Sequence, residues 1–286
     1  MKEIKKFIII PVYNDWKSLN KLLLKLDKEL RKKFSKIEVI VINDNSSEKI
    51  LISRNKFFSI ENIKVITLNK NIGSQRAILV GMQYLDKIKE DFVVTIMDSD
   101  GEDDPAQVSK MINAALMNPE KVITSNRKKR KESKIIILMY KIHLIFTFLL
   151  TLNWISFGNF TSFKKNNLKK LLSNNSSKFA HSSSVIKNCK IIRLYAKRKK
   201  RYFDKSKLSI LSLIEHSLRV NVVFQNKIVL TSSIYIFLSY IFLHNNYFLF
   251  ITFFLFSLNL LFFLIRIKFE KKTFYRMSKK IFIFNS

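Results

Sequence analysis

Five short apolar runs, separated by amphipathic segments, constrain the fold of this chain more than any other feature of its sequence. The runs are Phe7–Val12, Val39–Ile42, Val65–Leu68, Phe92–Met97 and Val122–Thr124. They are rich in Ile and Val, as is typical of buried parallel strands. Between the first two, leucines recur at helical spacing from Leu19 to Leu30, and Val108 to Leu116 repeats this pattern. Strands alternating with amphipathic helices predict a doubly wound α/β domain.

A dense acidic segment follows the fourth predicted strand. The sequence DSDGEDD at residues 98–104 places five carboxylates within seven residues. In an open α/β sheet, ligands bind beyond the carboxyl ends of the strands, and clustered carboxylates repel one another unless a cation is present. Hard oxygen ligands suit Mg²⁺ or Mn²⁺, which often bridge one or two carboxylates to a substrate diphosphate. The segment therefore predicts a divalent-metal site, and a solvated acidic turn is the alternative.

Polar residues also follow the first three predicted strands. These segments are PVYND at 11–15, NDNSS at 43–47 and NKNIGSQRA at 69–77. Asp44, at the end of the second strand, is well placed to accept hydrogen bonds from a nucleobase or ribose. Each segment alone is compatible with an ordinary helix cap, but together on one sheet edge they favour a nucleotide site. The sequence has neither GxGxxG nor a Walker lysine loop, which argues against a dinucleotide enzyme or a P-loop NTPase.

Two long apolar runs occupy the last quarter of the chain. They cover residues 228–243 and 247–265 and are separated by HNN at 244–246. The second run spans roughly 28 Å as a helix, close to the ~30 Å of a bilayer's hydrocarbon core. Lysine and arginine flank the pair of runs and are absent from the turn, which predicts that both flanks are cytoplasmic. We expect a transmembrane helical hairpin, with a buried helical pair in a soluble domain as the alternative.

These features predict three parts. Residues 1–227 form a cytoplasmic catalytic domain, residues 228–267 form the transmembrane hairpin, and residues 268–286 form a basic cytoplasmic tail. Within the first part, the apolar segment at about 135–152 contains Lys141 and His143, which favours a helix lying in the membrane interface over one that spans it. The apolar run before Pro11 is too short for a signal peptide. We therefore expect the catalytic domain and both termini on the cytoplasmic side of the inner membrane.

Net charge and cysteine content limit the kinds of partner that this chain is expected to bind. Lys and Arg number 52 against 21 Asp and Glu, a formal net charge of +31. Such a charge is typical of proteins that meet nucleic acid, anionic lipid or phosphorylated ligands. The sequence has no zinc-finger, RNA-binding or basic-zipper signature, so we expect no nucleic acid and favour the anionic face of a membrane. The single cysteine, Cys189, excludes an intramolecular disulfide and a cysteine-based zinc cluster.

Taken together, these motifs resemble glycosyltransferase family 2, whose fold is usually called GT-A, and within it the polyprenyl-phosphate sugar transferases. The resemblance covers about residues 4–215. PVYND matches the opening motif of the family, NDNSSE resembles its DDxS motif, and NIGSQRAILVG is similar to NxGxxxAxxxG. MDSDGEDDP resembles the DADLQDPP metal motif, RKKRYFDKSKL resembles RxxRxxGxSKY, and FGNFT resembles the GxFR turn. Asn43 replaces one aspartate of the family pattern, and Asp204 and Leu208 stand where glycine and tyrosine are usual.

The resemblance implies a role for individual residues. Asp98 and Asp100 match the metal-binding pair, and Glu102 takes the place of a metal-binding glutamine. The residues implied in chemistry are Asp100, Arg198 and Arg201, with the arginines near the donor and acceptor phosphates. The residues implied in binding the nucleotide sugar are Pro11, Tyr13, Asp15, Asp44, Asn71, Gly73, Gln75, Asp98, Ser206 and Lys207. Independently of the resemblance, the basic cluster at 197–201 suits phosphate groups or a membrane surface.

The resulting expectation is metal-dependent, inverting transfer of a hexose from a nucleotide sugar to a polyprenyl phosphate. No Asp or Glu occurs from Ser133 to Phe203, which leaves His143 and His181 as candidate bases there. A phosphate acceptor is largely ionised at neutral pH and needs no base. The alternatives are a family 2 enzyme acting on a sugar hydroxyl in surface polysaccharide assembly, which needs a base, and an inactive scaffold or lipid-binding protein. A homo-oligomer is compatible with all three.

Overall fold

The computed structural model of the chain describes residues 4–285, except residues 32, 35, 53–56, 128–133, 174–175, 197, 204–209, 244 and 272–280. It divides into two compact units. The first comprises Met1–Arg130, Phe157–Lys207 and Arg276–Ser286, and the second comprises Lys131–Ser156 and Leu208–Tyr275. This division differs from the expected boundary at residue 227, because the helices over Lys134–Thr151 and Ile210–Val222 pack with the C-terminal helices.

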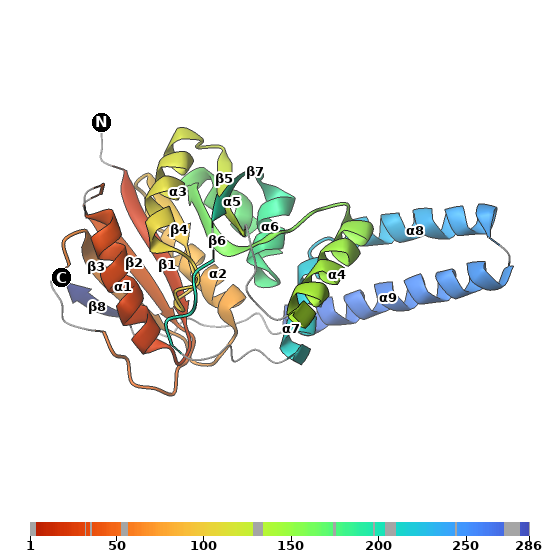
Figure 1. Cartoon of the computed structure of the whole chain (residues 1–286), viewed down its shortest axis with the longest axis horizontal. Helices are drawn as coiled ribbons and strands as arrows, with labels where there is room; N and C mark the ends of the chain where they lie inside the picture. The colour runs from red at the N-terminus through yellow and green to blue at the C-terminus, as the bar shows by residue number, and fades with distance from the viewer. Residues whose placement is uncertain are drawn as a thin grey trace. The chain divides into compact units, whose positions relative to one another are not determined.

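The first unit is built on a mixed sheet (Figure 1). Its strands are β1 (Lys5–Val12), β2 (Ile37–Asn43), β3 (Ile60–Thr67), β4 (Phe92–Ile96), β5 (Lys121–Arg127), β6 (Phe157–Lys164), β7 (Lys190–Ala196) and β8 (Ile281–Asn285). Among the described residues, these eight form one sheet in the order β7-β5-β6-β4-β1-β2-β3-β8. Strands β3, β2, β1 and β4 run parallel to one another, whereas β6 is antiparallel to both β4 and β5. The five predicted strands are β1 to β5, and the predicted mixed α/β class is confirmed.

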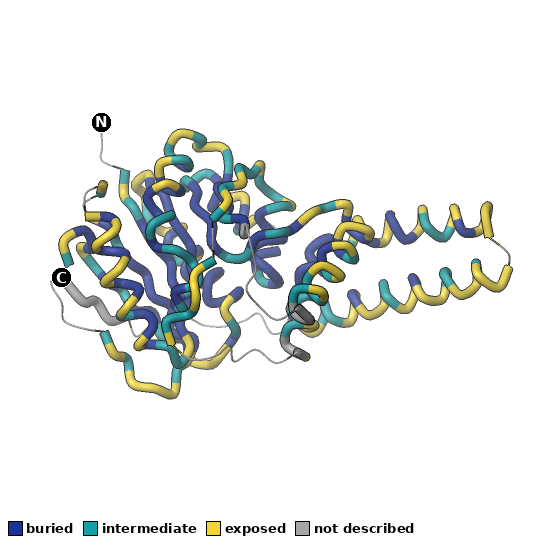
Figure 2. The backbone as a smooth tube through the Cα atoms, in the orientation of Figure 1, coloured by how far each residue is buried: buried dark blue, intermediate teal, exposed yellow. Residues whose placement is uncertain are grey.

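Helices cover both faces of the sheet, as the doubly wound prediction requires. They are α1 (Trp16–Leu30), α2 (Ser74–Asp86), α3 (Pro105–Met117), α5 (Lys165–Ser173), α6 (His181–Asn188) and the 3₁₀ turn η1 (Ser176–Lys178). Helices α1 and α3 pack together against the side of β1 that carries Ile8 and Ile10, and α2 packs with α5 on the other side. Gly81 of α2 lies directly over Ile9 of β1. A Cβ at position 81 would come within 2.8 Å of Ile9 Cγ2, so glycine allows this close approach of helix and strand. Figure 2 shows the strands buried between these layers.

The carboxyl ends of three adjacent parallel strands meet at one edge of the sheet. Strand β1 lies between β4 and β2, and its register pairs Val12 with Asn43 and Ile9 with Ile96. The segments after β1, β2 and β4 therefore emerge side by side, with Asp44 and Asp98 among them. This edge is where an open α/β sheet binds its ligands.

The second unit contains four helices in its described residues: α4 (Lys134–Thr151), α7 (Ile210–Val222), α8 (Gln225–Phe242) and α9 (Asn245–Lys271). Helices α8 and α9 hold the two predicted apolar runs and pack against each other. Within the described residues, only α9 is by itself long and apolar enough to cross a membrane; α8 meets that standard only together with α7, as a pair bent by 85°. Many large side chains of α9 are exposed, Phe250 and Phe253 among them, although Phe262 is buried; a core helix of a soluble protein buries most of its large side chains.

Helix α4, the predicted interfacial helix, is tied to the other helices of this unit by polar contacts. Asn221 Nδ2 on α7 donates to Thr147 Oγ1 (3.2 Å), and Thr231 Oγ1 on α8 donates to the carbonyl oxygen of Leu150 (2.7 Å). The helix also exposes apolar side chains, including Leu138 and Ile142. Such a helix suits an apolar or interfacial environment, and its placement in the membrane interface stays a prediction.

Candidate active site

The acidic loop, which we define as residues 97–104, folds largely on itself after β4. Asp100 Oδ1 accepts the Glu102 amide (2.9 Å), and Asp103 Oδ2 accepts the Asp98 amide (3.0 Å). Asp104 caps α3 by accepting the Ala106 amide at Oδ1 (3.2 Å), and Pro105 suits the first helical position because it has no N–H to satisfy. Asp103 and Asp104 thus fix the loop and the helix behind it.

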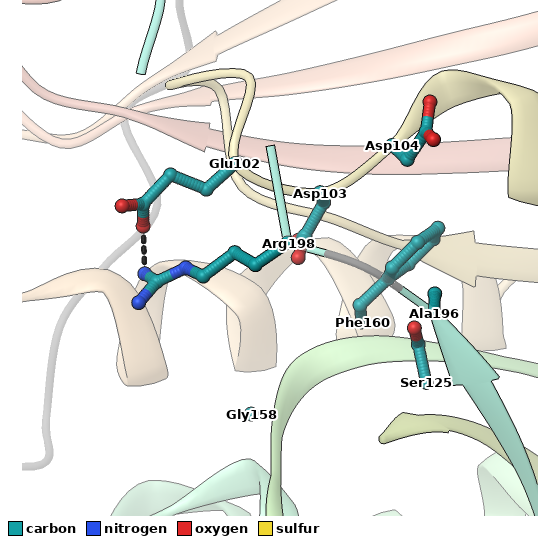
Figure 3. Close-up of a pocket in the computed structure, with 8 residues that line it drawn as sticks. All are labelled: Glu102, Asp103, Asp104, Ser125, Gly158, Phe160, Ala196 and Arg198. Atoms are coloured by element: carbon teal, nitrogen blue, oxygen red, sulfur yellow. Dashed lines mark ion pairs between the residues drawn. The ribbon is translucent and has the colours of Figure 1, made fainter. Parts of the chain in front are cut away.

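A second segment lies directly on this loop. We call residues 198–203, which follow β7, the strap. Arg201 Nη2 forms an ion pair with Asp100 Oδ2 (2.9 Å), and Arg198 Nη2 forms one with Glu102 Oε2 (Figure 3). The carboxylates predicted to bind metal and the arginines predicted to bind phosphate are therefore brought together. Because unlike charges at hydrogen-bond distance favour each other's ionised form, the strap offsets the repulsion within the acidic loop.

Main-chain contacts reinforce these ion pairs. The Lys199 amide donates to the carbonyl of Glu102, and the Tyr202 amide donates to the carbonyl of Asp100, each at 3.0 Å. The Tyr202 ring covers Gly101, whose φ is +83°. This glycine allows both the left-handed backbone of the loop and the close approach of the ring.

Burial and charge perturb the titration of the strap. Desolvation lowers the pKa of the Arg198 guanidinium, and the nearby carboxylates of Asp100 and Asp98 oppose that shift. Desolvation, followed by the charges of Asp104 and Asp100, raises the pKa of Tyr202 to about 12. Tyr202 is thus a neutral phenol at physiological pH, and it acts in the site as a packing group.

Asp44 has a well-defined local role. It is 2% exposed, and its two oxygens accept the amides of Ile72 (2.7 Å) and Gly73 (2.8 Å). Desolvation raises the pKa of Asp44 to about 6, against the lowering effect of these two hydrogen bonds. The aspartate therefore holds the segment that enters α2, and its predicted contact with a nucleobase or ribose stays a prediction.

Asparagines organise the neighbouring loops, and our sequence reasoning gave them no role. Asn43 Oδ1 accepts the Ser46 amide (2.9 Å), and Asn14 Oδ1 accepts the Ser47 amide (2.9 Å). Asn14 and Asn45 adopt positive φ values of 48° and 56°, which asparagine tolerates better than most residues. The clustering of Asn and Ser directly after two strands was the signal available for these turns.

The remaining predicted binding residues lie in different environments. Pro11 is buried in β1, Tyr13 is exposed, and Asp15 occupies the N-cap position of α1. Asn71 is exposed, whereas Gln75 is buried in α2. The last two, Ser206 and Lys207, lie outside the described residues.

The two histidines considered as bases are engaged elsewhere. His181 is fully buried at the start of α6, where its Nε2 lies 2.8 Å from Thr161 Oγ1, and burial lowers its pKa to about 4. Neutral and inaccessible, it serves as a core residue. His143 belongs to the second unit, where its Nδ1 lies 2.5 Å from Ser217 Oγ.

A pocket opens between the acidic loop, β6 and the strap. It is lined by Glu102, Asp103, Asp104, Ser125, Gly158, Phe160, Ala196 and Arg198 (Figure 3). No three His, Cys, Asp or Glu side chains among the described residues converge as a metal cage, so Asp98, Asp100 and Glu102 are not assembled into the expected three-ligand set. Their oxygen chemistry still fits Mg²⁺ or Mn²⁺ in the common mode in which one or two carboxylates share the ion with a substrate diphosphate.

The sequence is similar to those of known glycosyltransferases. The chain is 30% identical over 128 residues to the undecaprenyl-phosphate 4-deoxy-4-formamido-L-arabinose transferase of Proteus mirabilis, covering 44% of this chain and 38% of that protein. It is 28% identical over 131 residues to an uncharacterised glycosyltransferase of Bacillus subtilis, covering 46% of this chain and 39% of that protein. The match thus spans about two-fifths of the length of these curated relatives.

Solved structures agree on the fold. Mannosyl-3-phosphoglycerate synthase from Rubrobacter xylanophilus superposes with a TM-score of 0.50 at 11% identity, over 78% of this chain and 74% of that one. The model of the family described as glycosyl transferase family 2 matches residues 7–186, well over half of the sequence. The predicted family and GT-A type fold are confirmed: this chain belongs to glycosyl transferase family 2.

Proposed function

We propose that this protein transfers a hexose from a nucleotide sugar to a polyprenyl phosphate at the cytoplasmic face of a membrane, with Mg²⁺ or Mn²⁺ as cofactor. The observation that carries this proposal is the pairing of the acidic loop with the strap. Carboxylates suited to a metal–diphosphate complex lie beside the guanidinium groups of Arg198 and Arg201 at the ligand-binding edge of the sheet.

The donor diphosphate would bind across this pairing. Asp98 and Asp100 would hold the divalent ion, which neutralises charge on the leaving diphosphate. Arg198 and Arg201 would exchange their carboxylate partners for phosphate oxygens, which guanidinium groups bind bidentately. The protein's contribution is then positioning and charge stabilisation of the donor and acceptor.

The environment of His181 supports a phosphate acceptor. This histidine is buried in the core with its pKa lowered to about 4, so it is not placed to take a proton from an acceptor hydroxyl. Transfer to a phosphate needs no such base, because the acceptor is already an anion at neutral pH. This favours the polyprenyl phosphate over the sugar-hydroxyl alternative.

The membrane part of the proposal rests on the second unit and on relatives. Helix α9 is long enough, at about 40 Å, to cross a bilayer, and its exposed phenylalanines suit lipid. The name of the Proteus mirabilis relative specifies an undecaprenyl-phosphate acceptor. Its sugar is a modified arabinose, so the donor screen below includes both pentose and hexose donors.

A thermal-shift screen tests the proposal. The full-length protein in detergent is heated with pentose and hexose derivatives of UDP, GDP and dTDP, each with and without Mn²⁺. Donors that stabilise it are then assayed for transfer to a short polyprenyl phosphate. A donor at 100 times its Kd adds about 2.7 kcal/mol of stability, or roughly 5–10 °C in Tm for a domain of this size. The proposal would be rejected if no donor raised the Tm. It would also be rejected if the rise in Tm were the same with and without Mn²⁺ and in the Asp100→Asn variant.

A further inference from the structure

We propose that Gln75 and Asn159 are positioning residues that orient the carboxylate of Asp98 through a one-way chain of hydrogen bonds. The chain begins at the main-chain amide of His181, which donates to Gln75 Oε1 (2.7 Å). Gln75 Nε2 donates to Asn159 Oδ1 (2.9 Å), and Asn159 Nδ2 donates to Asp98 Oδ1 (3.0 Å). Three elements of the first unit, α6, α2 and β6, are thereby connected to the acidic loop.

The ends of the chain fix its direction. A main-chain N–H can only donate, so Gln75 must present its oxygen to His181 and its NH₂ group to Asn159. Asn159 must then present its own oxygen to Gln75, which leaves its NH₂ group for Asp98. An ionised carboxylate can only accept, so the last bond agrees with the first. Neither amide can rotate by 180° without placing two donors or two acceptors face to face.

Because these hydrogen bonds are buried or partly buried, reversing their direction would leave polar groups without partners. Gln75 is 5% exposed, so water does not readily replace a lost partner. The backbone of Asn159 is held as well, because Thr161 Oγ1 donates to its carbonyl oxygen (3.2 Å) and also contacts His181 Nε2 (2.8 Å). Asn159 is thus fixed at both its main chain and its side chain, and Asp98 receives a hydrogen bond from a preset direction.

This inference rests on the proposed function, because orienting Asp98 matters for catalysis only if Asp98 binds the metal–diphosphate complex. It gives Gln75 a different role from the donor contact that the sequence suggested. Groups that hydrogen-bond a metal-binding side chain set its geometry, and changing them typically lowers metal affinity or activity about 10–100-fold.

The Gln75→Glu variant reverses the chain with little change in shape. The introduced carboxylate still accepts the His181 amide but, when ionised, has no donor for Asn159. Asn159 must then rotate, which turns its oxygen toward the carboxylate of Asp98. We expect the Mn²⁺ concentration for half-maximal stabilisation by the nucleotide sugar to rise about tenfold or more. The control is Gln83→Glu, which adds the same charge to an exposed position of the same helix and should leave that concentration unchanged.

A double-mutant cycle tests the chain without any ligand. In the Asp98→Asn background, the rotated Asn159 oxygen meets an amide donor, so Gln75→Glu should lower the Tm less than it does in the wild type, by about 2 °C or more. In the Asn159→Ala background this coupling between positions 75 and 98 should vanish. Additive effects, or coupling that persists without Asn159, would overturn the inference.

The two experiments separate failure of the chain from failure of the proposed function. If the wild type shows no Mn²⁺-dependent nucleotide binding, the proposed function is wrong, and with it the catalytic role given to Gln75 and Asn159. If the wild type binds the nucleotide with Mn²⁺ but Gln75→Glu matches Gln83→Glu, the function stands and the positioning role is refuted.

Discussion

Gly101→Ala should damage the active site through one identifiable clash. A Cβ at this position would lie 2.4–2.5 Å from three atoms of the Tyr202 ring, and Gly101 has φ = +83°. The positive φ costs an alanine about 1–2 kcal/mol. Moving the ring also weakens its contacts with the ammonium groups of Lys25 and Lys21, 4.4 and 5.2 Å from its centroid, each worth about 0.5–1 kcal/mol. The sum is about 2–4 kcal/mol, or roughly 5–15 °C in Tm.

The same clash should reduce turnover. Tyr202 donates its amide to Asp100, and the adjacent Arg201 pairs with the carboxylate of Asp100, so displacing the ring displaces both contacts. We expect kcat to fall about tenfold or more, equivalent to about 1.4 kcal/mol of the barrier. Differential scanning fluorimetry and a donor-transfer assay measure the two effects.

Gly73→Ala provides a control that has strain but no clash. Gly73 has φ +85° and ψ 152°, a backbone region used almost only by glycine, and a Cβ there meets nothing within 4 Å, so this variant reports backbone strain without a clash. The double variant Gly101→Ala/Tyr202→Ala removes the ring and should show a smaller added loss from the alanine at 101. If removing the ring gives no relief, the assignment of Tyr202 as the obstacle is wrong.

Four further changes follow from the same reasoning. Asp100→Asn should abolish turnover and metal-dependent donor binding while the fold is retained; full activity of this variant in EDTA would contradict the metal site. Burial raises the pKa of Asp44 from 3.8 to about 6, so its contribution to stability is present below pH 4 and is lost, by about 3 kcal/mol, as the pH rises through 6. The Tm of Asp44→Asn should not fall in this way between pH 4 and 7. If the variant and the wild type showed the same dependence of Tm on pH, this account of Asp44 would be rejected. His181→Ala should lower Tm but preserve the pH dependence of kcat; a loss of about 10³ in kcat with unchanged acceptor binding would revive the hydroxyl alternative. A cysteine placed at Asn245 should resist labelling from the cytoplasmic side of sealed vesicles, and efficient labelling there would disprove the expected topology.

Strands β1 to β5 were predictable from the sequence, whereas β6, β7 and β8 were not, and β8 lies in the segment expected to be a basic tail. The run Phe7–Val12 falls within β1, and Val39–Ile42 falls within β2. Strand β6 was missed because its buried side chains include Thr161 and Ser162, whose hydroxyl groups bond to His181 and Thr95 rather than to water. A pattern based on apolar periodicity does not detect a buried strand whose polar groups pair inside the fold.

The chemistry of the site was predictable to a similar extent. Five carboxylates at a strand end and a cluster of arginines indicated a metal and phosphate site, and the structure brings these two segments together. The partner of each charge was not predictable, because Asp100 and Arg201 meet only through the sheet topology. Gln75 shows the same limit: its motif suggested a ligand contact, but Asn159 reaches it from a strand 84 residues away.

The strap also explains how such an acidic loop is stable within the folded chain. Five carboxylates in seven residues repel one another, and the chain supplies cations of its own, since Arg198, Arg201 and Lys199 pair with Glu102, Asp100 and Asp104. Under the proposed function, a donor arrives as a diphosphate with a divalent cation, so each arginine that leaves a carboxylate gains a phosphate oxygen, and each carboxylate gains the metal. Binding then exchanges ion pairs without leaving a charge uncompensated, and this exchange avoids the desolvation penalty of an isolated charge. Removing one strap arginine should therefore harm the free protein as well as the complex, because it leaves a carboxylate unpaired in the free protein and a phosphate oxygen unpaired in the complex.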